Sequence, residues 1–252
     1  SDHGFSKSIF GVNLDDALIR AGLKRGKDST DLVTVGNDQV AMIHIEDRNK
    51  ETICAAVSWL QKQPWVDVLF TAPPEDAGSV FNQNRSEGSV PGTFSMETIH
   101  FWNRDASPDI LVTFPWSSEK NLFGLQGTDC EIAAVHGSMN APRSSHGSMS
   151  PWVIRNTMIA WGPSVKKGIA YTAPVGIVDV SALLLKLHGL PIDEQIEGRV
   201  PAEALQDGAD PEKVPVQTHV LKTCSPDGQY SAVLQISVVD DKRYVDKGWR
   251  TR

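Results

Sequence analysis

Two side chains that can ligate a metal ion stand next to each other in Asp2-His3-Gly4. Adjacent aspartate and histidine side chains reach one ion only where the backbone turns sharply, and the glycine that follows permits such a turn. A carboxylate oxygen together with an imidazole nitrogen suits Zn²⁺ or Mn²⁺. Taken alone the tripeptide is a weak indication, and the alternative is a polar segment with a charged pair.

A second candidate ligand is His146, which precedes a predicted strand at residues 156–161. A loop that leads into a strand can present a ligand at the edge of a sheet. His136 repeats the same His-Gly-Ser-Met text ten residues earlier, but it lies deeper in loop sequence. We therefore predict that His146 is the ligand and that His136 shapes the pocket rim. A solvated loop histidine is the alternative for each residue taken by itself.

The other four histidines lack such a context. His44 falls in a predicted hairpin strand and His188 at a predicted helix end, where a structural or dipole-facing role is expected. His100 and His219 have no acidic residue or histidine at ligand spacing. The sequence also has no GxGxxG, P-loop or GxSxG motif. A metal site is therefore the chemistry that the residue pattern favours.

Composition limits the function classes further. The 252 residues include 24 Lys+Arg against 31 Asp+Glu, a formal charge of −7, and 40% of them are hydrophobic. The acidic balance argues against a nucleic-acid-binding module, and no apolar run approaches the roughly 18–20 residues of a membrane span. Three cysteines far apart are too few for a disulfide framework or a thiolate zinc site.

The elements that must position the candidate ligands mix helices and strands. We expect helices at 14–23, 50–62 and 179–187, and strands at 31–35, 39–45, 65–71, 109–114, 156–161, 216–223 and 230–239, with a further strand near Tyr244. A helix directly followed by a strand favours an α/β layout. The Pro-, Gly- and Ser-rich stretches 73–92 and 115–151 are expected to be long loops. Helix 179–187 is apolar nearly all round and is therefore expected to be buried between layers.

Several short motifs, taken in order, resemble the alkaline phosphatase superfamily, and most closely its type I phosphodiesterase/nucleotide pyrophosphatase branch. They are Asp2-His3-Gly4, His146-Gly147 with Ser150-Pro151, the run from Asn156 to Pro163, Leu187-His188-Gly189-Leu190-Pro191, and Glu197-Gly198-Arg199. The resemblance covers residues 1–206. It implies an α/β fold, part of a doubly wound sheet, and leaves residues 207–252 as a small β-hairpin-rich C-terminal appendage.

The resemblance implies a metal-dependent phosphoric ester hydrolase with two divalent metal ions, Zn²⁺ being favoured over Mn²⁺. Asp2 and His3 match ligands of one site, and His146 matches the late histidine of the other. The family's Thr or Ser nucleophile and its remaining ligands would lie upstream of Ser1. The chain is therefore expected to be the C-terminal portion of the enzyme, without a catalytic nucleophile and inactive alone.

The same resemblance implies a small phosphate ester or nucleotide-type substrate and favours a periplasmic or secreted location. Two other functions stay open. A sulfatase or phosphonate hydrolase of the same superfamily would carry its distinguishing nucleophile upstream. A non-catalytic binding or structural module would retain the fold but hold no ion tightly, whereas the complete enzyme should hold about two ions per chain.

Overall fold

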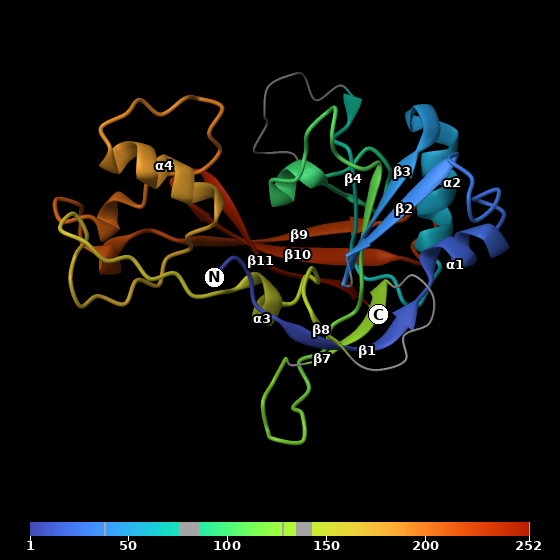
Figure 1. Ribbon diagram of the computed structural model, residues 1–252, viewed down its shortest axis with the longest axis horizontal. Coiled ribbons are helices and arrows are strands. Elements are labelled where there is room, and N and C mark those ends of the chain that lie inside the picture. The colour runs from blue at the N-terminus through green and yellow to red at the C-terminus, as the bar shows by residue number, and fades with distance from the viewer. Residues whose placement is uncertain (38, 76–85, 128, 135–142, 252) are drawn as a thin grey trace.

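The computed structural model describes residues 1–37, 39–75, 86–127, 129–134 and 143–251 (Figure 1). The fold is mixed α/β, mostly β, with three separate sheets. The strands are β1 (Ser6–Val12), β2 (Leu32–Asn37), β3 (Val40–Ile45), β4 (Leu69–Thr71), β5 (Phe94–Ser95), β6 (Ile110–Thr113), β7 (Asp129–Ala134), β8 (Arg143–Ser145), β9 (Gln217–Cys224), β10 (Ser231–Val239) and β11 (Lys242–Thr251). The helices are α1 (Leu14–Arg20), α2 (Lys50–Leu60), α3 (Pro151–Ile154) and α4 (Val178–Leu187), with short 3-10 turns that include η3 (Met96–Ile99). The α/β class is confirmed at this level, and the doubly wound arrangement stays a prediction.

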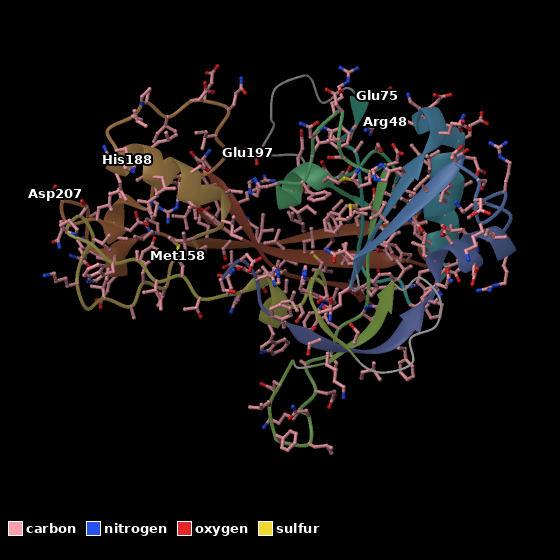
Figure 2. All side chains as sticks on the ribbon, viewed as in Figure 1. Arg48, Glu75, Met158, His188, Glu197 and Asp207 are labelled. Carbon is pink, nitrogen blue, oxygen red and sulfur yellow. The ribbon has the colours of Figure 1, made fainter. Side chains whose placement is uncertain are left out.

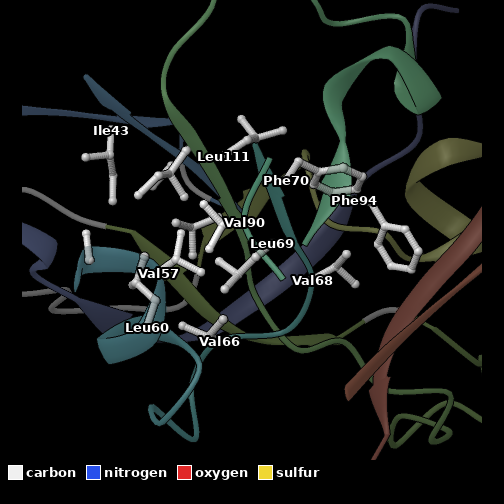
Figure 3. Packing of buried hydrophobic residues seen from close by; sticks show 14 of the residues in the cluster. Ile43, Val57, Leu60, Val66, Val68, Leu69, Phe70, Val90, Phe94 and Leu111 are labelled. Atoms are coloured by element: carbon white, nitrogen blue, oxygen red, sulfur yellow. The ribbon is translucent and has the colours of Figure 1, made fainter. Parts of the chain in front are cut away.

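The largest sheet has five strands in the order β2-β3-β6-β4-β5. All neighbours are antiparallel except β4 and β5. Its centre is β6, whose four residues are all buried, as the apolar run at 109–114 predicts. Helix α2 begins at the cap Asn49, whose side chain accepts a hydrogen bond from Thr52 N, and buries Val57 and Leu60 in the same core (Figure 3).

A three-stranded sheet, β7-β1-β8, contradicts the expectation that 115–151 is only loop. β1 pairs parallel with β7 and antiparallel with β8. Strand β1 was also not predicted from the sequence, because polar residues lie on its buried side and an apolar residue lies on its exposed side. Ser6 and Ser8 are buried while Phe10 is exposed, and no apolar alternation marks an inner face. The β2–β3 loop is also shorter than predicted, since β2 runs on through Asn37.

The C-terminal sheet has the order β11-β10-β9 and confirms the predicted hairpin and the third strand near Tyr244. Its central strand joins the main core, because Ala232 and Leu234 on β10, and Tyr230 just before it, are buried in one cluster with β4 and β6. The Tyr230 hydroxyl donates to the carbonyl oxygen of Asp67 over 2.7 Å. The domain boundary at residue 206 stays a prediction.

Two predictions about the region after residue 150 are wrong. Residues 156–161 form no strand, and Trp161 is 95% exposed. Their backbone N–H groups donate to no backbone carbonyl in the described part of the chain. Helix α4 buries only Asp179, Ala182 and Leu183, and leaves Leu184 half exposed. Both predictions failed because apolar character does not specify a packing partner. Among the described residues, no helix has the length and apolar character needed to cross a membrane.

Candidate metal centre

The predicted ligands His3 and His146 lie against each other, although they are far apart in the sequence. Their rings stack with centroids 3.8 Å apart and planes 20° from parallel. The pairing of β1 with β8, which places Ser6 opposite Ser145, brings them together. Phe5 contacts both rings edge-on, at centroid distances of 4.9 Å from His3 and 5.8 Å from His146. The structure therefore gathers three residues of the sequence motifs, Asp2 included, at one end of the small sheet.

Each histidine is followed by a glycine that the packing requires. A Cβ on Gly4 would lie 2.1 Å from the backbone oxygen of Trp152, and Gly4 N donates to Val153 O over 2.8 Å. Gly147 has a φ of +106°, and a Cβ there would meet Val40 at 2.7 Å. The glycines thus let the ligand-bearing segments approach α3 and β3 more closely than any other residue would allow.

Sequence reasoning missed Gln39, the residue that fixes β1 beside His146. Its side chain is fully buried. Its Oε1 accepts from the Ser6 hydroxyl over 3.0 Å, and its Nε2 donates to Ser6 O and to the Ser8 hydroxyl, each over 3.1 Å. Its backbone N–H donates to His146 O over 3.3 Å. Gln39 therefore ties both ligand-bearing segments to the start of β3, and the buried serines of β1 are the sequence signal that accompanies it.

The carboxylate of Asp2 faces the imidazole of His3. Asp2 Oδ2 lies 3.2 Å from His3 Nε2, and His3 Nδ1 lies 2.9 Å from Gly4 O. A carbonyl oxygen can only accept a hydrogen bond, so Nδ1 is the protonated nitrogen and donates its hydrogen bond to Gly4 O. In the neutral ring, Nε2 then presents a lone pair to a carboxylate oxygen. Two acceptors at this distance need a proton or another cation between them.

The Asp2–His3 pair fits a metal ion. For Zn–N and Zn–O bonds of about 2.0–2.2 Å and a tetrahedral angle, two ligand atoms on one zinc ion lie about 3.4 Å apart, close to the 3.2 Å found here. An Nδ1–H donated to a carbonyl is also the usual arrangement behind a metal-bound Nε2. In the described part of the chain, however, no three or more His, Cys, Asp or Glu side chains form one metal-binding group. Asp2 and His3 as metal ligands therefore stay a prediction, one that requires further ligands.

Asp2 is ready to act as an anion. Its side chain is 74% exposed. Hydrogen bonding from its own backbone N–H holds the pKa of Asp2 below its usual value, although desolvation acts in the opposite direction. Only an ionised carboxylate ligates a cation. The lowered pKa favours the ionised form of Asp2, which is the form that a metal site would require.

His136 lies outside the described residues, so its predicted role at the pocket rim stays a prediction. His44 on β3, His188 at the end of α4 and His219 on β9 occupy the elements predicted for them. His100 differs, because its Nδ1 lies 2.5 Å from Glu197 Oε2 and its Nε2 lies 3.0 Å from Arg243 O. Sequence spacing missed this pair because 97 residues separate its members. Figure 2 labels Glu197 and His188 on either side of α4.

The Glu197-Gly198-Arg199 motif packs against the first turn of α4 and forms hydrogen bonds there. Arg199 N donates to Asp179 Oδ1 over 2.8 Å, and the Arg199 guanidinium pairs with Glu203 at 2.7 Å. A Cβ on Gly198 would lie 2.0 Å from the backbone oxygen of Val178. Every one of these contacts joins the motif to neighbouring structure. These contacts account for how the motif holds α4 in place.

The chain was compared with protein-family models, with curated proteins and with solved structures, and none of the three comparisons found a match.

Proposed function

We propose that this chain carries part of the metal site of a phosphoric ester hydrolase of the phosphodiesterase or nucleotide pyrophosphatase type. The observation that supports the proposal most is the convergence of Asp2, His3 and His146 at one end of the β1 sheet. The motif order that motivates the family assignment predicts this convergence. The proposed substrate is a small phosphate ester or a nucleotide-type diester.

In this proposal each candidate residue has a separate role in binding metal. Asp2 and His3 hold one divalent ion, Zn²⁺ or Mn²⁺, through Oδ2 and Nε2, and His146 belongs to the neighbouring site. The Gly4 carbonyl oxygen fixes the His3 tautomer by accepting a hydrogen bond from Nδ1–H. A divalent ion in such a site polarises the phosphoryl oxygens and stabilises the leaving oxygen. We assign no residue of the chain as the nucleophile. The proposal therefore concerns how the chain binds metal and how that metal would stabilise negative charge on the phosphate group of the substrate.

Zinc binding by the chain itself tests the assignment of the ligands. Titration calorimetry with ZnCl₂ should give binding that weakens at least tenfold in Asp2→Asn and in His3→Ala. His188→Ala removes an exposed histidine at the end of α4 and is the matched control, whose affinity should equal that of the wild type. Equal affinity in all four proteins would overturn the assignment.

Substrate class is tested with the longest natural polypeptide that contains this chain. We expect it to hydrolyse a chromogenic aryl phosphate diester and to lose that activity on exhaustive chelation. Activity toward an aryl sulfate in place of the phosphate would favour the sulfatase alternative. Absence of hydrolysis together with absence of tightly held zinc would favour a non-catalytic module.

A further inference from the structure

Strand β9 is an open edge of the C-terminal sheet, beside β10 (Figure 1). In an antiparallel ladder, about half of a strand's N–H and C=O groups point away from its one neighbour. Outside the ladder with β10, the backbone of Gln217–Cys224 makes no hydrogen bond to any residue that the structure describes. The strand is exposed along most of its length, and Val220 keeps 54% of its surface in solvent. β9 therefore offers a row of unpaired backbone groups.

The opposite edge of the same sheet is covered. On β11, Gly248 N donates to Met149 O over 2.9 Å, and Gly248 O accepts from Trp116 Nε1 over 2.6 Å. Gly92 lies against the backbone of Cys224 at the end of β9, where an added Cβ would be 3.2 Å from the Cys224 carbonyl carbon, but residues 217–221 lack the usual protection of an exposed edge. The strand contains no proline, its register with β10 is unbroken, and its only charged residue is Lys222. An eight-residue edge of this kind is suited to pair with another strand.

We propose that β9 pairs with β9 of a second copy of the chain, antiparallel about a two-fold axis that passes through Val220. Outward-bonding and inward-bonding residues alternate along a strand, so in an antiparallel pair of identical strands only registers centred on a residue match. The register centred on Val220 uses almost the whole strand. It also sets the two half-exposed valines against each other.

The charges on the strand are compatible with this register. With Val220 on the axis, Lys222 faces Thr218 of the other copy and His219 faces Leu221. Every titratable side chain of the strand is then opposite a neutral one. With Lys222 on the axis, two ammonium groups would be opposite each other, an arrangement that destabilises a strand pair. An axis at Leu221 would overlap as many residues and would also keep Lys222 opposite a neutral side chain. The axis at Val220 is preferred because it pairs the more exposed side chain with its own copy, Val220 being 54% exposed and Leu221 partly buried.

The dimer should be weak. A contact between two strand edges is smaller than the roughly 800 Å² per partner of a standard stable interface. We therefore expect monomer at low concentration and a growing fraction of dimer as the concentration of the protein rises.

Sedimentation velocity of the full chain across a hundredfold concentration range tests the proposal. Val220→Lys places two ammonium groups at the axis and should leave only monomer at every concentration. The matched control is Val35→Lys, which adds the same charge at a partly exposed valine of β2, and should dimerise like the wild type. A wild-type chain that stays monomeric throughout, or a dimer that persists in Val220→Lys, would overturn the proposal.

A cross-linking experiment tests the register itself. With Val220 on the axis, residue 216 faces Cys224 of the partner subunit. In a background that carries Cys54→Ser and Cys130→Ser, Val216→Cys should therefore yield a covalent dimer when an added copper–phenanthroline oxidant converts the two thiols into a disulfide. Within one chain these positions are about 27 Å apart at 3.4 Å per residue, too far for a disulfide. Adding Cys224→Ser should abolish the dimer, and Val35→Cys should not give it; cross-linking without Cys224 would contradict the register.

Discussion

Replacing Gln39 by leucine should weaken the contact between β1 and the start of β3, and so destabilise the arrangement that positions His3 and His146. The change removes three side-chain hydrogen bonds, to the Ser6 hydroxyl, to Ser6 O and to the Ser8 hydroxyl. Both serines are buried, so each lost bond leaves a polar group without a partner, at about 1–2 kcal/mol each. The free energy of unfolding should fall by about 3–6 kcal/mol, a large part of the roughly 5–15 kcal/mol typical of a domain.

Urea denaturation followed by fluorescence measures this loss, and two further variants make it specific. Gln206→Leu removes one hydrogen bond of an exposed glutamine and should change stability by no more than about 0.5 kcal/mol. Adding Ser6→Ala and Ser8→Ala to Gln39→Leu removes the orphaned hydroxyls and should recover at least about 1 kcal/mol. A loss below about 1 kcal/mol in Gln39→Leu, or a further loss when the serines are replaced, would refute the reasoning.

Three other predictions concern the site and its surroundings. Gly4→Ala should weaken zinc binding, because its Cβ would overlap the Trp152 backbone oxygen; unchanged calorimetric affinity would contradict the packing argument. In the complete enzyme, His146→Ala should lower aryl phosphate diesterase activity by orders of magnitude and His136→Ala by about tenfold or less; the reverse ranking would exchange their roles. Burial lowers the pKa of His100, but hydrogen bonds to Glu197 and the Arg243 carbonyl outweigh it and raise the pKa overall. The stabilisation from this raised pKa is complete below the ordinary value near 6.5 and is lost as pH rises through the folded-state pKa, so the free energy of unfolding should fall there; urea titrations of His100→Gln should lack that slope, and an unchanged slope would assign it to another group.

Sequence reasoning succeeded where a single physical pattern dominates an element. The apolar run of β6, the capped α2 helix after Asn49, and the turn between β9 and β10 each carry a local signal that tertiary structure does not override. The pairing of His3 with His146 could be anticipated only through the order of the motifs, because no local pattern connects residues so far apart.

The errors have physical causes. β1 escaped detection because its inner face is Ser6 and Ser8, held by a glutamine from another strand. Residues 158–161 are apolar, yet Trp161 is exposed, because hydropathy alone does not determine which part of the chain covers a segment. The His100–Glu197 pair depends on folding that brings η3 beside the segment after α4, which spacing in the sequence does not encode.

The position of a bound ion tests the central claim most directly. Crystals of the chain soaked in ZnCl₂ can be measured above and below the zinc absorption edge, so that anomalous scattering locates the metal without reference to any activity. The account predicts an anomalous peak about 2.0–2.2 Å from both His3 Nε2 and an Asp2 carboxylate oxygen. Zinc bound elsewhere while this position stays empty would contradict the assignment of Asp2 and His3 as metal ligands.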